Sequence, residues 1–214
     1  MLKWLLIFLI FFESLTLINC AKRGILTGGL KDTIPPVLIS ANPPINNLNF
    51  NSEKITLNFN EYIELKDINE QLIISPPLER KDYKIIPENT VTKKVEIEIN
   101  NQLRKNSTFT FNFGSSIADY NEGNALPFFN YTFSTGDYLD SLKISGFVKD
   151  AYEIDSLNFV SIHLYPIDSV FSDSTIYNKK PFYVGNTLDS IYFELNGLAP
   201  GKYEFIAIKD KSKN

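Results

Sequence analysis

Oxygen-bearing side chains crowd one short stretch of the chain in a way that would suit a metal ion. They belong to Asp119, Asn121, Glu122 and Asn124. Carboxylate and amide oxygens are the ligands that Ca²⁺ prefers. Gly123 stands where an EF-hand needs a ligand, and no glutamate follows at the twelfth position. Asn, Asp and Gly are also the residues that tight turns favour, so the pattern leaves a calcium loop open and favours a polar turn.

Two other residues have the chemistry of general acids or bases. Glu61 comes one residue after a strand-like alternation, but glycoside hydrolysis needs a second carboxylate at a defined separation, and the sequence does not place one. We therefore expect Glu61 to bond backbone amides near a strand end. His163 shares a predicted strand face with Ser161, and no Gly-x-Ser-x-Gly elbow accompanies it. We expect a partly exposed strand residue there and predict no catalysis.

Aromatic residues gather in the last third of the chain and offer a third kind of chemistry. They are Tyr177, Phe182, Tyr183 and Tyr192. Rings that line up on one exposed sheet face stack against sugars, whereas most aromatic residues of strands belong to the core or to cross-strand pairs. A glycan-binding face therefore stays open beside a role in the core.

The composition excludes several classes of function. Of the 214 residues, 43% are hydrophobic and 14% aromatic, which is enough to bury a core and argues against a disordered chain. The 21 Lys and Arg and the 25 Asp and Glu give a net charge of −4 without a basic cluster, so no nucleic-acid partner is expected. One Cys and one His build neither a disulfide nor a zinc site, and no cofactor is predicted.

The N-terminus has the three parts of a secretory signal. Lys3 supplies a positive charge, residues 4–12 are apolar, and a less apolar stretch leads to Cys20. A membrane-spanning helix needs roughly 20 apolar residues, and Glu13 interrupts this run long before that length. The pattern favours a signal peptide over residues 1–19, with a short uncleaved anchor as the alternative.

Cys20, the only cysteine, stands where the apolar segment ends. The segment Leu17–Cys20 (LINC) resembles the lipobox of bacterial lipoproteins, although Asn19 replaces the usual small residue. The resemblance implies that the mature chain begins at Cys20 and carries acyl chains such as palmitate, which would hold the protein on a membrane. The competing interpretation is a free thiol.

Beyond a Gly- and Pro-rich tether at residues 20–35, short alternating runs of β-formers are separated by Asn, Gly, Pro and Asp. They predict strands near 37–41, 54–60, 71–75, 83–86, 94–99, 108–113 and 129–134, and then near 143–149, 159–165, 181–184, 190–195 and 203–208. The first series has the strand count of an immunoglobulin-like sandwich. The second is shorter, and we expect a smaller sandwich at 143–214 that is either open, with an unpaired edge strand, or incomplete, which the pattern favours.

Several motifs resemble a known family. They are Thr27–Val37 (TGGLKDTIPPV), Phe59–Tyr62 (FNEY), Ile73–Leu78 (IISPPL), Phe111–Gly114 (FNFG), Asn121–Asn124 (NEGN) and Phe133–Gly136 (FSTG). Together they look like the Bacteroidetes envelope lipoproteins that open with an SbsA-type bacterial Ig-like domain, here at residues 36–136. Leu195–Tyr203 (LNGLAPGKY) is similar to a corner of transthyretin-like or carboxypeptidase-regulatory-like sandwiches.

The resemblance implies an all-β, non-catalytic protein of the cell envelope. We expect an Ig-like sandwich followed by a transthyretin-like or carboxypeptidase-regulatory-like one, anchored by lipid to the outer membrane and facing the periplasm. These modules would act as a spacer or a scaffold for an envelope protein partner. The alternative function is a carbohydrate-binding accessory module with a glycan partner.

Overall fold

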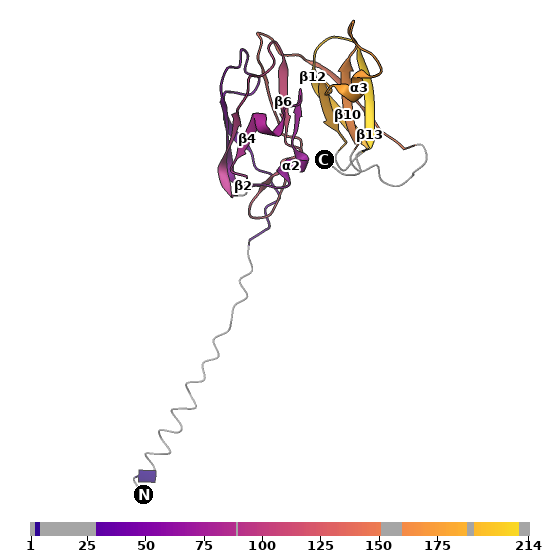
Figure 1. The fold of residues 1–214 in the computed structure, drawn as a ribbon. Helices are drawn as coiled ribbons and strands as arrows, with labels where there is room; N and C mark the ends of the chain where they lie inside the picture. The colour runs from indigo at the N-terminus through magenta and orange to yellow at the C-terminus, as the bar shows by residue number, and fades with distance from the viewer. Residues whose placement is uncertain (1–2, 5–28, 89, 151–159, 188–190, 210–214) are drawn as a thin grey trace. The chain divides into compact units, whose positions relative to one another are not determined.

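A computed structural model describes residues 3–4, 29–88, 90–150, 160–187 and 191–209, as Figure 1 shows. The chain forms two compact units, residues 1–32 and 33–214. Cys20 and most of the predicted signal peptide and tether lie outside the described residues. None of the helices in the described ranges has the length and hydropathy needed to cross a bilayer. Pro36, where we expect folding to begin, is the first buried residue of the second unit.

Two antiparallel sheets form the first sandwich, which spans residues 33–136. One sheet has the order β1-β2-β5-β4, with β7 paired to the end of β2, and the other has the order β3-β6-β8. A short helix, α2, and a 3-10 turn, η1, connect strands. The bounds are β1 (Leu38–Asn42), β2 (Lys54–Leu65), α2 (Ile68–Gln71), β3 (Ile73–Ser75), η1 (Arg80–Asp82), β4 (Tyr83–Ile86), β5 (Thr92–Ile99), β6 (Thr108–Asn112), β7 (Ile117–Asp119) and β8 (Asn130–Ser134).

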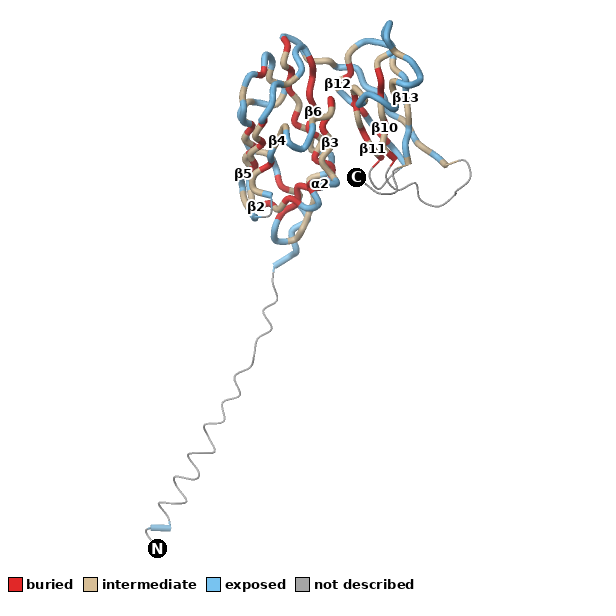
Figure 2. Tube along the Cα trace, viewed as in Figure 1, coloured by how far each residue is buried: buried red, intermediate tan, exposed pale blue. Residues whose placement is uncertain are grey.

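The core of this sandwich follows from the alternation of side chains along its strands. Val95, Ile97 and Ile99 on β5 are buried, whereas Glu96 and Glu98 lie on the outer face and bind Lys54. On the facing sheet the ring of Phe133 packs against other aromatic rings, those of Phe50, Phe109, Phe111 and Tyr131. Figure 2 shows the buried residues concentrated on the strands.

Two smaller sheets form the second sandwich at residues 142–209. One has the order β11-β10-β13 and the other pairs β12 with β9. The bounds are β9 (Leu142–Phe147), β10 (Val160–Pro166), α3 (Thr175–Asn178), β11 (Tyr183–Asn186), β12 (Tyr192–Leu198) and β13 (Tyr203–Lys209). Its core is a cluster built from Ile162, Leu164, Tyr183, Phe193 and Leu195 with their neighbours.

The prediction of an all-β fold is confirmed, and the differences lie in single elements. Gln71, expected in a strand, ends helix α2. The second strand continues five residues beyond its expected end, so Glu61 lies inside β2 and not after it. Strand β7 was not predicted, because all three of its residues are buried and no polar face alternates with an apolar one. Phe159 and Ser190, expected in strands, lie outside the described residues.

The two sandwiches contact each other directly within the compact unit 33–214. Strands β11 and β12 lie against β3 and β6. The Val184 amide donates to the Ser75 hydroxyl at 3.2 Å, and the Asp140 amide donates to the hydroxyl of Thr108 at 2.8 Å. Gly197 fits closely against Thr108, since a Cβ there would lie 3.2 Å from its methyl group. We call this contact surface the junction.

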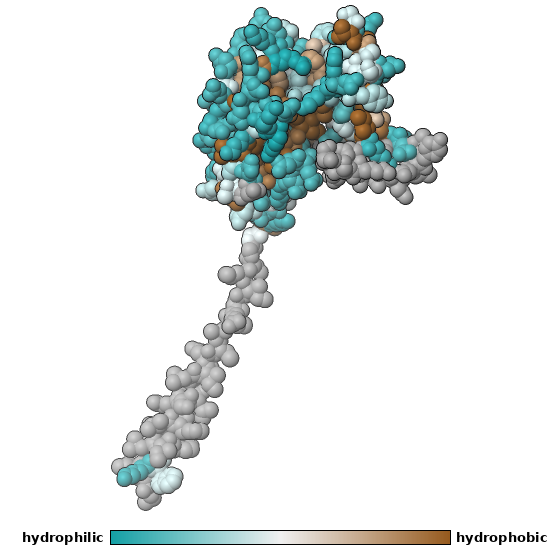
Figure 3. Space-filling model, in the orientation of Figure 1, coloured by the Kyte–Doolittle hydropathy of each residue, from teal (hydrophilic) through white to brown (hydrophobic). Residues whose placement is uncertain are grey.

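Two charged contacts extend the junction. Lys180 forms an ion pair with Glu79 at 2.9 Å, and the guanidinium of Arg104 lies 4.0 Å from the centre of the Phe182 ring. Each contact joins one side chain of each sandwich, and the contact of Arg104 with Phe182 ties the loop between β5 and β6 to the second sandwich. The surface in Figure 3 is mostly hydrophilic, with apolar residues in small groups.

Candidate functional site

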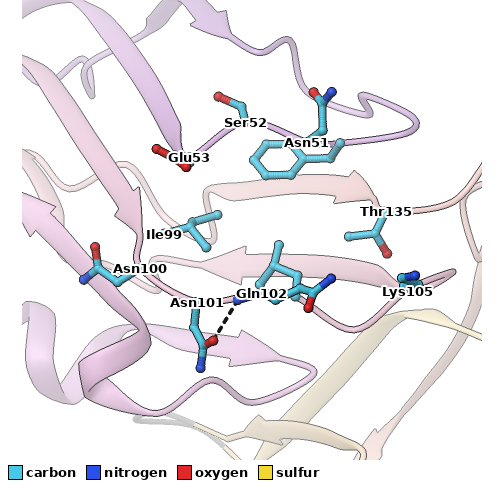
Figure 4. A pocket seen from close by; sticks show the side chains of 11 residues that line it. Asn51, Ser52, Glu53, Ile99, Asn100, Asn101, Gln102, Lys105 and Thr135 are labelled. Carbon is cyan, nitrogen blue, oxygen red and sulfur yellow. Dashed lines mark hydrogen bonds between the residues drawn. The ribbon is translucent and has the colours of Figure 1, made fainter.

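A cavity of 520 Å³ lies at one end of the first sandwich, where three connecting segments meet. Figure 4 shows its lining. Residues 50–53 lead into β2, residues 99–105 follow β5, and Thr135 follows β8. We call it the end pocket. The lining residues are Phe50, Asn51, Ser52, Glu53, Ile99, Asn100, Asn101, Gln102, Leu103, Lys105 and Thr135.

The first wall is held by backbone pairing with the end of β8. The Asn49 amide donates to the carbonyl of Gly136 at 2.7 Å, and the Phe50 amide donates to the carbonyl of Ser134 at 2.9 Å. Ser52 closes a small turn, because its hydroxyl donates to the carbonyl of Lys54 at 2.7 Å. These bonds fix the backbone while the side chains of Asn51 and Glu53 remain exposed.

The second wall depends on Asp82 of the η1 turn. The Asn100 amide donates to the Asp82 carbonyl at 2.7 Å, and the Asn101 side-chain amide donates to the Asp82 carboxylate at 3.0 Å. The Asn101 side-chain oxygen in turn accepts the Gln102 backbone amide at 2.8 Å, which Figure 4 marks with a dashed line. These bonds fix the backbone of residues 100–102 and the carboxamide of Asn101 on one rim.

The third wall is formed by Thr135 and by the part of the loop between β5 and β6 that also reaches the junction. The Thr135 hydroxyl donates to the carbonyl of Arg104 at 2.7 Å and accepts the Ser107 amide at 3.1 Å. Arg104 itself stacks on Phe182 of the second sandwich. Lys105, the next residue along the chain, lines the end pocket. The shape of the end pocket is therefore linked to the contact between the sandwiches.

Chemically, the end pocket combines an apolar floor with a mostly neutral polar rim. Phe50 and Ile99 are buried and Leu103 is half-buried, so carbon surface lies beneath the carboxamides. The only ionisable lining residues are Glu53 and Lys105, whose charges cancel. One carboxylate is too few for glycosidase-type hydrolysis, which needs a pair. Within the described ranges, no group of three or more His, Cys, Asp or Glu is arranged to hold a metal ion.

Asp119 holds together the loop that the sequence left open as a calcium loop or a polar turn. Its carboxylate is buried and accepts the backbone amides of Glu122, Gly123 and Asn124 at 2.7, 3.1 and 2.8 Å. Burial alone would raise the pKa of the Asp119 carboxyl, but these amides outweigh it and hold the pKa below its ordinary value. Both carboxylate oxygens are thus engaged by the loop itself, which is the bonding of a polar turn.

The four aromatic residues considered as a sugar platform do not share one surface. Tyr183 is only 2% exposed, and its hydroxyl accepts the Ala199 amide at 2.9 Å. Phe182 packs against the second core beneath Arg104, whereas Tyr177 is exposed on α3. Tyr192 pairs with Phe147 across β9 and β12. Tyr183 thus takes the role in the core that the sequence left open.

His163 lies on β10, half-buried and beside Ser161, as predicted. Its Nε2 and the Ser161 hydroxyl are 2.9 Å apart. Burial lowers the pKa of the His163 ring, which favours the neutral form. The end pocket is far along the chain from this pair, and His163 does not line it.

Sequence reasoning missed the end pocket. Its signal was present as the consecutive carboxamides Asn100, Asn101 and Gln102, which follow a strand, but such residues also suit an ordinary turn. Residues 50–53 and Thr135 join them only through tertiary packing. Nothing local in the sequence brings these three segments together.

Comparison with known families identifies one part of the chain. Residues 32–135 match the model of the bacterial Ig-like domain. No curated protein and no solved structure matches the chain. The predicted Ig-like domain is therefore confirmed, while the lipobox and the Bacteroidetes origin stay predictions.

Proposed function

We propose that this protein is a lipid-anchored scaffold of the bacterial cell envelope that holds a partner protein away from the membrane. The first sandwich is a bacterial Ig-like domain, a type of module that suggests a non-catalytic scaffold or interaction role. The observation that carries the proposal is the junction. A spacer can hold a partner protein at a fixed distance from the membrane only if its two sandwiches keep a fixed orientation relative to each other.

The junction supports such a relation through several kinds of contact. Backbone-to-hydroxyl hydrogen bonds join β11 to β3 and residue 140 to β6. The Lys180–Glu79 ion pair and the Arg104–Phe182 contact add to them. Exposed ion pairs contribute little on their own. A set of contacts spread over two sheets nevertheless restricts rotation about residues 137–141, which link the two sandwiches.

The membrane anchor rests on the sequence alone. Cys20 follows an apolar segment and resembles a lipobox cysteine, and each acyl chain would add about 0.8 kcal/mol per buried methylene. We propose the outer membrane, with the modules facing the periplasm, because Lys22 and Arg23 follow the cysteine where surface-exported lipoproteins carry acidic residues.

Intact mass and membrane fractionation in a Bacteroidetes host test the anchor. We expect the wild type to lose residues 1–19, to gain the mass of acyl chains and to fractionate with outer membranes. Cys20→Ala should do none of these. If both chains behave alike, the anchoring part of the proposal is wrong.

Distances between spin labels test the scaffold. In a Cys20→Ala background, labels at Lys84→Cys and Lys179→Cys report across the junction, and labels at Lys84→Cys and Glu70→Cys report within the first sandwich. We expect equally narrow distance distributions for the two pairs. A broad distribution across the junction alone would contradict a rigid scaffold.

A further inference from the structure

We propose that the end pocket binds a neutral carbohydrate of one or two sugar units without chemically changing it. This activity goes beyond the scaffold role and uses different residues from the aromatic cluster of the second sandwich. The end pocket has the volume of an ordinary small-ligand site, since such sites span roughly 300–1,000 Å³.

The rim has the hydrogen-bonding character that hydroxyl groups need. A side-chain amide both donates and accepts, and so does each hydroxyl of a sugar. Four carboxamides, on Asn51, Asn100, Asn101 and Gln102, line the end pocket. A ring with several hydroxyls can therefore pair with this rim in either direction, whereas a purely acidic or basic ligand would leave half of these groups unused.

The rim is partly anchored and partly available. Asn101, Ser52 and Thr135 are fixed by hydrogen bonds to neighbouring backbone or side chains. Of the described contacts, none occupies the side chains of Gln102 or Asn51, which also line the end pocket. A preorganised frame with free donors and acceptors reduces the entropy lost on binding.

The floor and the charges narrow the ligand class further. Half-buried Leu103, which lies with the buried Phe50 and Ile99 in the lining, offers carbon surface that suits the apolar C–H face of a sugar ring. A phosphate or nucleotide would need more than the single cation of Lys105. A lipid tail would need an apolar rim, and this rim is polar. The remaining class is a neutral polyhydroxylated ring, with Glu53 and Lys105 available as charge-assisted partners of its hydroxyls.

The same lining argues for binding without turnover. Both mechanisms of glycoside hydrolysis use two carboxyl groups that flank the bond. Glu53 is the only carboxylate of the lining. A bound sugar would therefore be released unchanged, as expected for a recognition site on a scaffold.

Titration of the ¹⁵N-labelled chain, with Cys20→Ala, tests the proposal. The probes are N-acetylglucosamine, cellobiose, maltose and xylobiose, with glucuronic acid and glucose 6-phosphate as charged comparators. We expect at least one neutral sugar to shift the amide signals of residues 50–53 and 99–105. No shifts with any neutral sugar, or stronger binding of a charged comparator, would overturn the proposal.

Variants then assign the binding to the end pocket. Gln102→Ala and Asn51→Ala should each weaken binding about ten-fold, because each loses hydrogen bonds to the sugar. Asn69→Ala, which removes an exposed carboxamide from α2, is the matched control and should leave the affinity unchanged. Equal affinities for all three variants would exclude the end pocket. Since every chain here lacks the anchor, the result is independent of lipidation.

Discussion

The two sandwiches differ in how completely they bury their own apolar residues. Among the residues that the structure describes, eighteen buried hydrophobic residues form the core of the first sandwich and seven form the core of the second. Strand β9 in the second has no fully buried residue, and Phe147 on it is 69% exposed. Phe205 and Ile208 on β13 are also exposed. Both β9 and β13 lie at sheet edges among the described strands.

This difference indicates that the two sandwiches have different sources of stability. The first closes around a continuous aromatic and aliphatic core, so its stability is expected to come from within. In the second, β11 and β12 rest on the first sandwich through the junction. The contact therefore contributes to the fold of the second sandwich as well as to its position.

The largest expected effect comes from emptying each core in turn. Phe133→Ala removes a ring that contacts four others, and should lower the free energy of unfolding by about 3–5 kcal/mol. Phe193→Ala should cost less than about 3 kcal/mol, because its partner Phe205 is itself exposed and the site can collapse. Urea unfolding followed by circular dichroism measures both, and equal losses would contradict the comparison.

A smaller effect is expected from crowding the second core. A Cβ at Gly185 would lie 2.9 Å from Cγ of the buried Leu195, so Gly185→Ala should destabilise the protein by about 1–3 kcal/mol. Gly29→Ala is the control, since a Cβ added at Gly29 would have no neighbouring atom within 4 Å. An unchanged melting temperature for Gly185→Ala would show that the second core has room to spare.

The contact between Arg104 and Phe182 at the junction should contribute less to stability than the packing at Gly185. A double-mutant cycle with Arg104→Ala and Phe182→Ala should give a coupling free energy of about 0.5–2 kcal/mol, as expected for a cation over an aromatic ring. Urea unfolding supplies the four values. Strict additivity would show that the two sandwiches do not support each other at this point.

The smallest effect depends on pH. Side-chain hydrogen bonds from Lys81 and Lys180 lower the pKa of Glu79 to about 2 from 4.5. The ionised Glu79 carboxylate therefore stabilises the folded protein fully above pH 4.5. This contribution decreases on acidification and is lost near pH 2. The melting temperature of the wild type should exceed that of Glu79→Gln at pH 7, and the difference should shrink below about pH 4.5.

Lys180→Gln separates the part of this effect that belongs to the junction. It removes the partner from the second sandwich and keeps Lys81. We expect it to reproduce part of the loss at pH 7. A pH-independent difference between wild type and Glu79→Gln would argue against the ion pair as its source.

Periodicity within single strands was readable from the sequence. Residues 83–86 form β4 with the predicted bounds, and the buried Val95 and Ile97 alternate with the half-buried Glu96 and Glu98 on the outer face, as expected. The alternation of apolar and polar residues did not predict burial where neighbouring elements cover both faces of a strand. Ile117 and Ala118 point to opposite faces of β7 and both are buried, so β7 is covered on both sides. Glu61 continues β2 through a shift in its pairing with β5.

The sequence by itself determined the all-β class, the Ig-like domain and the position of the lone cysteine, because these depend on local alternation and on short motifs. The tertiary structure decided which aromatic rings are buried, which loops form the end pocket and how the sandwiches meet. Gln102 and Asn51 are brought to one cavity by strand pairing between distant segments. Such pairing is set by the packing of whole sheets, which no short stretch of sequence specifies.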